Sequence, residues 1–333
     1  MRYHRRGLHA CVLPLLMAVG LFAAPAQGAE PKQDSAAASP RLKYLPKDYW
    51  FVAECDVGTI MKYVNAAGAQ QNPQFAQLQQ YLQMAKQFTG IDLQKDVNWV
   101  TVFAAGKHDE PKGMVVVQGS FKNAAVTKRL SQSLGESFVE DAYNKHTIYA
   151  VPGATLTFPE DSTILVGDEN LVKESLDQLD NGKPKLPDAL KSVLGRTKTT
   201  SLVWAAVQPQ VFLKDKDNLP DWLASDTHLL NALKKIECVS LTCDVSDDGL
   251  TIKGLGYIPQ GEVKGVYQYL SDRKKKILHH EGANVLFTAL LILAEVKMED
   301  TFIEGSFRLT GESLKELWDT KVIVRPGSGS EEK

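Results

Sequence analysis

The sequence predicts an α+β protein made of two tandem related domains, each an antiparallel sheet of β-hairpins with amphipathic helices packed on one face. Three observations indicate this fold class. Short strand-like runs alternate with apolar stripes at helical spacing. Polar, glycine-containing turns join many of the strands in pairs. The second half of the chain restates the pattern of the first.

The first half begins with a predicted strand at Trp50–Val57. A helix with one apolar stripe starts at Pro73 and ends at Gly90, because proline favours the first turn of a helix and glycine the end. Residues 97–104 are apolar on both faces, which is typical of an interior strand. A polar turn leads from them into 114–117, so the two runs predict a hairpin followed by a short amphipathic helix.

Three more short strands are expected at 147–151, 155–158 and 163–166. Asp168 is placed to cap the helix that follows them. Residues 183–199 contain two prolines and then a short leucine-bearing helix, which indicates a linker between the domains.

The repeat appears when Trp50–Lys62 is shifted by 152 positions onto Leu202–Lys214, so that Ala53 falls on Ala205. A hairpin turning at Asp247-Asp248-Gly249 follows, and then a helix that starts near Val263.

A partial third copy ends the chain, with a hairpin over 296–309 and a helical stripe at 314–318. Gly305 in this copy echoes Gly119 and Gly254 in the others. The shared unit is strand, tight turn, strand and amphipathic helix. A lone hairpin is marginally stable, so we expect such units to stack side by side and bury one core.

The N-terminus has the three parts of an export signal. Arg2, Arg5 and Arg6 form a basic region, Cys11–Ala24 is apolar, and cleavage is expected after Gly28, with Ala26 as the alternative. An uncleaved membrane anchor is the other interpretation. Lipid attachment at Cys11 is rejected, because the apolar run follows this cysteine instead of preceding it.

These features divide the chain into six parts. They are a signal peptide at 1–28, a flexible leader at 29–42, a first α+β repeat domain at 43–182, a linker with a short helix at 183–199, a second α+β repeat domain at 200–324, and a disordered tail at 325–333.

Charge and hydropathy exclude several classes of partner. The chain carries 38 Lys and Arg against 40 Asp and Glu; removing the three signal arginines leaves 35 against 40, a net charge of −5. A mildly acidic protein lacks the basic surface of a nucleic-acid binder. The most apolar mature segment, Ala283–Ala294, is shorter than the ~20 residues that cross a bilayer, so no stable membrane span is expected in the mature chain. We interpret this segment as a buried helix or a core strand, with a surface that docks a protein partner as the alternative.

Three cysteines remain in the mature chain, at Cys55, Cys238 and Cys243. Cys238 and Cys243 lie about 17 Å apart on one predicted strand, too far to bridge each other. Cys55 can pair with either one if their strands are neighbours. The favoured interpretation is three small buried side chains without a disulfide.

Several polar clusters have residue types found in binding sites, but a structural role explains them better. Arg273–Lys276 with His279-His280-Glu281 is explained best as a solvated helix end, because adjacent imidazoles point apart. Asp244, Asp247 and Asp248 lack the glutamate of a calcium loop and are typical of a hairpin turn.

Two further groups of acidic residues received the same interpretation. Glu54 and Asp56 share one face of a strand, as paired catalytic carboxylates do, but a surface strand face gives the same pattern. His108-Asp109-Glu110 lies in a turn. No nucleophile elbow, metalloprotease motif, P-loop or dinucleotide fingerprint is present, so the sequence names no catalytic, cofactor-binding or metal-binding residue and implies no cofactor.

Two motifs, Leu45–Val52 and Thr89–Val97, resemble uncharacterised secreted bacterial proteins grouped as domains of unknown function with duplicated α+β repeats. The resemblance spans roughly residues 42–320 and implies export and a repeated fold, with no activity or site residues. We therefore expect a periplasmic or extracellular protein that binds partners or has a structural role in the envelope, and is not an enzyme. The alternative is a hydrolase of envelope or extracellular material with a site invisible in sequence.

Overall fold

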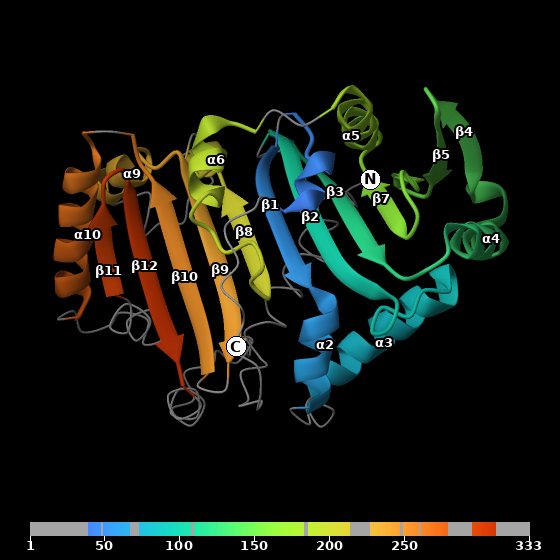
Figure 1. Ribbon diagram of the computed structural model, residues 1–333, viewed down its shortest axis with the longest axis horizontal. Helices are drawn as coiled ribbons and strands as arrows, with labels where there is room; N and C mark the ends of the chain where they lie inside the picture. The colour runs from blue at the N-terminus through green and yellow to red at the C-terminus, as the bar shows by residue number, and fades with distance from the viewer. Residues whose placement is uncertain are drawn as a thin grey trace, which may run out of the picture.

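In the computed structural model, twelve strands form one continuous antiparallel sheet (Figure 1). The structure describes residues 39–47, 49–66, 73–107, 110–182, 186–213, 227–246, 249–259, 261–278 and 295–310. The strands are β1 Tyr49–Asp56, β2 Val97–Lys107, β3 Glu110–Gly119, β4 Val139–Tyr143, β5 His146–Val151, β6 Ala154–Thr157, β7 Thr163–Gly167, β8 Val203–Val207, β9 Cys238–Ser246, β10 Gly249–Tyr257, β11 Glu295–Glu299 and β12 Phe302–Leu309. Their order across the sheet is β11-β12-β10-β9-β8-β1-β2-β3-β7-β6-β5-β4.

The expectation of two separate sheets is wrong. β1 and β8 pair along their edges, with Ala53 opposite Ala205, and join the two halves of the chain in the middle of one sheet. The physical reason is that an edge strand with unpaired backbone groups is stabilised by another strand. β1 and β8 are both apolar, so the pairing also buries their side chains, among them Val52 and Trp204.

Helices cover both faces of the sheet, whereas we expected them on one face. Their bounds are η2 Pro40–Tyr44, α2 Val57–Ala66, α3 Pro73–Thr89, α4 Asn123–Leu134, η4 Gly135–Ser137, α5 Glu169–Asn181, α6 Asp188–Leu194, α7 Gln210–Leu213, α9 Thr227–Leu233 and α10 Val263–Leu278. Strands with apolar side chains on both faces need cover on both sides.

The largest core lies on the face covered by η2, α5 and α6. Phe103 and Trp204 from the sheet pack there with Leu42, Leu176 and Leu190 from these three helical segments. On the opposite face α4 packs over β6 and β7, α2 over the centre, and α9 with α10 over β12. Residues 183–199 therefore do more than link: Leu190, Val193 and Leu194 of α6 are part of the main core.

Local signals in the sequence agree with the structure. Gly90 ends α3 with a φ of 77°, and Asp168 caps α5 by accepting the N–H of Asn170 at 3.0 Å. The hairpins β2–β3, β9–β10 and β11–β12 form as expected, and Gly249 has a φ of 126° at its turn. The predicted signal, the apolar segment 283–294, the helical stripe at 314–318 and the tail lie outside the described residues.

The end of the predicted flexible leader is ordered. Residues 39–42 enter η2, where Ser39 and Leu42 are buried against the sheet. This part of the leader expectation is wrong because Leu42, Tyr44 and Leu45 bring an apolar surface that packs into the main core.

No helix among the described residues combines the length and apolar character that crossing a bilayer requires.

Candidate functional site

The structure places a shallow open pocket of about 210 Å³ near the β11 end of the sheet. Its lining comes from β10, β11, β12 and the segment after α6, and consists of Arg196, Leu255, Lys297, Met298, Glu299, Phe302 and Glu304. Because most of these residues sit on hydrogen-bonded strands, the pocket has a rigid base.

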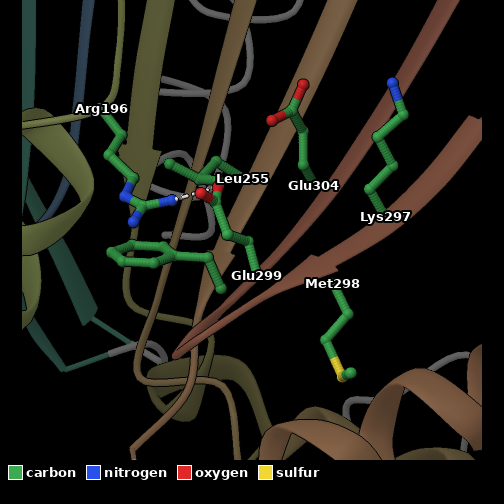
Figure 2. A pocket seen from close by; sticks show the side chains of 7 residues that line it. Arg196, Leu255, Lys297, Met298, Glu299 and Glu304 are labelled. Atoms are coloured by element: carbon green, nitrogen blue, oxygen red, sulfur yellow. Dashed lines mark hydrogen bonds and ion pairs between the residues drawn. The ribbon is translucent and has the colours of Figure 1, made fainter.

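Arg196 organises one wall of this pocket. Its guanidinium lies 4.2 Å from the centre of the Phe302 ring and donates to Glu299 Oε2 at 2.7 Å. Figure 2 shows Arg196 turned toward Glu299, while Lys297 and Glu304 stand apart from that pair. Stacking on an aromatic face holds a guanidinium flat and partly dehydrated. The pocket therefore joins an apolar base to side chains of both charges.

The lining of this pocket offers both charged and apolar contacts. The seven side chains are two cations, two carboxylates and three apolar groups. Such a surface fits a partner that offers an apolar group beside a charged one.

A second polar cluster lies at the centre of the sheet around Glu54. Its carboxylate is fully buried and accepts four hydrogen bonds: Arg41 and Trp204 donate to Oε1 at 2.5 and 3.2 Å, and Ser39 and Thr101 donate to Oε2 at 2.8 and 3.2 Å. The guanidinium of Arg41 also lies 4.1 Å from the centre of the Trp99 ring. These contacts satisfy the carboxylate within the protein, so the cluster fastens η2 to the sheet.

The sequence-derived interpretation of Glu54 as part of a surface strand face is therefore wrong. β1 pairs with a strand on each edge, and η2 covers the face of β1 that carries Glu54. Glu54 is therefore only 1% exposed. Asp56 has a separate role, because it accepts the N–H and the O–H of Thr59, both at 2.8 Å, at the start of α2. The two carboxylates are therefore engaged by different sets of partners.

Asp244, a candidate calcium ligand in the sequence, is engaged by residues that lie more than 40 positions earlier in the sequence. It accepts the O–H of Ser201 at 2.9 Å and the N–H of Leu202 at 3.2 Å, and pairs with Lys198 at 3.3 Å. Within the described ranges, no group of three or more His, Cys, Asp or Glu side chains is placed to hold a metal ion.

The structure describes only part of the remaining polar clusters. Asp247, Asp248, His108 and Asp109 lie outside the described residues, as do 279–281. Glu110 is exposed at the start of β3, and residues 273–276 belong to α10.

Cys55, Cys238 and Cys243 are buried free thiols, in agreement with the favoured interpretation of three buried side chains without a disulfide. Cys55 and Cys243 both lie opposite Val203 in the ladders on either side of β8, so one whole strand separates them. Burial raises the pKa of Cys55, Cys238 and Cys243 to about 12. A thiol that stays protonated is a poor nucleophile and a poor metal ligand.

These thiols predict a loss of stability in alkaline solution. Above pH 9, the ordinary pKa, thiols in the unfolded chain lose protons that the folded chain retains until about pH 12. The free energy of unfolding should therefore fall as the pH rises through this window. Urea unfolding at pH 8 and pH 10.5 measures the fall, and a triple Cys→Ala variant should show a shallower one. If the free energy of unfolding falls equally in both proteins, the buried thiols are not the cause of the alkaline loss of stability.

Sequence reasoning missed Ser39, Arg41 and Arg196, whose partners lie 15, 13 and 103 positions away. One signal for the Glu54 cluster was present, since a single carboxylate interrupts the apolar run Trp50–Cys55. A charge in such a strand needs a buried partner.

None of the protein-family models matches this chain, and no curated protein matches it. Among solved structures, the chain is similar to TP0453. Crystal form III has a TM-score of 0.44 at 13% identity, covering 86% of this chain and 100% of that one. Crystal form I has a TM-score of 0.45 at 12% identity, covering 85% and 98%. A likeness of this degree carries no argument about function.

Proposed function

We propose that this chain is an exported, non-enzymatic protein that binds a partner in the periplasm or cell envelope. The observation that carries the proposal is the pocket around Arg196, whose lining combines charged and apolar side chains. Export rests on the basic, apolar and small-residue pattern of residues 1–28.

The strand order supports a related proposal, that the two halves of the sheet descend from one duplicated unit. Outward from β1 the order is β2, β3, β7 and β6, and outward from β8 it is β9, β10, β12 and β11. In each half the hairpin next to the centre precedes a helix, α4 or α10. Ala53 and Ala205, matched by the sequence shift of 152, face each other in the ladder. Among the described residues, the hairpin β4–β5 extends the half that contains β1 and has no counterpart in the other half.

Capture of partners with the tagged mature chain, residues 29–333, tests the binding function. Envelope extracts are passed over the wild-type chain and over Arg196→Glu, and bound proteins are identified by mass spectrometry. We expect a specific partner whose binding falls about tenfold or more in the variant, because a central arginine contributes heavily to interfaces.

Lys128→Glu is the matched control, since Lys128 is exposed on α4 and remote in sequence from the pocket residues. It should retain the partner. The Arg196–Glu299 pair is exposed, so its loss should cost about 1 kcal/mol or less in stability. Capture of no specific partner, together with turnover in a panel of hydrolase substrates, would reverse the proposal.

A further inference from the structure

β4 forms the end of the sheet far from the pocket, at the right of Figure 1. Among the described residues it pairs with β5 alone. Residues 139–142 are exposed, and the side chain of Val139 is 53% exposed. A strand at the edge of a sheet presents unpaired backbone groups that template another strand.

The register of the hairpin identifies these groups. A two-residue turn, Asn144-Lys145, links Tyr143 to His146, which makes this closing pair hydrogen-bonded. Hydrogen-bonded pairs alternate in an antiparallel ladder, so the N–H and C=O of Glu140 and Ala142 point away from β5. An independent contact agrees, because the N–H of Ala142 donates to Asp141 Oδ1 at 2.8 Å instead of entering the ladder.

The rim of this edge is acidic. Glu136, Glu140 and Asp141 are exposed on or next to β4. Lys145 pairs with Asp180 at 2.9 Å, and Lys173 pairs with Glu169 at 2.5 Å while it also interacts electrostatically with Asp141. Antiparallel pairing with β4 of a second copy would bring these acidic side chains together, which is destabilising.

We infer that the β4 edge binds an extended segment of a partner protein in which lysine or arginine alternates with apolar residues. The segment adds a strand beside β4 by bonding to the outward N–H and C=O of Glu140 and to the outward C=O of Ala142, whose N–H is held by Asp141 Oδ1. Its cations lie on the face of Glu140, and its apolar side chains lie on the other face, where one of them covers Val139. The inference rests on the proposed binding function and specifies one partner, an extended segment with alternating basic and apolar residues.

Synthetic peptides test this recognition directly with the mature chain. The basic probe is a capped hexapeptide of alternating lysine and valine, and the two controls replace lysine with glutamate or methylate every second backbone nitrogen. Titrations followed by calorimetry should show the basic probe binding about tenfold more tightly than either control. Equal binding of the N-methylated peptide or of the acidic peptide would overturn the inference.

Two variants locate the probe. Glu140→Pro removes one outward N–H without removing a ladder bond to β5, and Glu140→Lys keeps the N–H but reverses the charge. Both should weaken the basic probe about tenfold, whereas Glu110→Lys, exposed at the start of β3, should not. Thermal unfolding checks that each variant folds, and the lysine variant gives a result even if the proline variant does not fold.

The outcomes separate this inference from the wider proposal. A partner captured equally by wild type and by both Glu140 variants refutes the role of β4 and leaves binding at the pocket intact. Wild-type dimers that Glu140→Pro dissociates in sedimentation experiments would identify a second copy as the occupant and overturn the inference. Failure of the wild-type chain to capture any partner would instead remove the proposed function.

Discussion

Arg41→Ala should lower the free energy of unfolding by about 3–5 kcal/mol. The substitution removes the cation that contacts Glu54 at 2.5 Å and leaves a carboxylate buried in the centre of the sheet without a counter-charge. It also removes the guanidinium that stacks on Trp99. Urea unfolding of the mature chain followed by circular dichroism measures the change.

A double variant distinguishes charge from packing. In Arg41→Met with Glu54→Gln, both charges are gone, and the amide oxygen still accepts from Trp204 or Ser39. We expect this protein to lose only about 1–2 kcal/mol, because replacing a buried ion pair is far less costly than breaking one. If Arg41→Ala alone costs less than about 1 kcal/mol, the pair does not fasten η2 to the sheet.

Gly119→Ala should destabilise the protein by about 3 kcal/mol, at the upper end for one inserted methyl group. Gly119 ends β3 opposite Val97, and a Cβ there would lie 1.7 Å from the carbonyl oxygen of Asp96. That carbonyl also accepts the N–H of Ser120 at 2.8 Å, so it cannot move without losing a hydrogen bond. Thermal unfolding measures the effect.

Gly305→Ala is the matched control, since Gly305 lies within β12 and a Cβ there would meet its nearest neighbour at 3.9 Å. Its stability should change by less than about 1 kcal/mol. If both variants lose the same amount of stability, β3 and the segment before β2 can move apart easily. That result would contradict the close contact between Gly119 and Asp96.

The same two glycines show how far a sequence motif predicts a structure. Both belong to hairpins, as the pattern indicates, but a Cβ on Gly119 would collide with a neighbouring backbone, whereas a Cβ on Gly305 would meet its nearest neighbour at 3.9 Å. Hairpin and helix ends, such as Gly90 and Asp168, depend on residues close in sequence and were predictable for this reason.

Contacts between distant residues were not predictable in the same way. The pairing of β1 with β8 joins residues about 150 positions apart, and no local signal selects one strand edge over another. The Glu54 cluster depends on that pairing, because Trp204 reaches Glu54 only across it. The pocket likewise needs Arg196 to meet Glu299, 103 positions later.

The pairing of β1 with β8 has a consequence for how the chain folds after synthesis. β1 is complete by residue 56, but its second neighbour begins at residue 203. Until that stretch has been synthesised, the nascent chain carries an apolar strand whose second edge has no hydrogen-bonding partner strand. High contact order slows folding and prolongs this exposure. The topology therefore lengthens the time during which this apolar strand is open to aggregation.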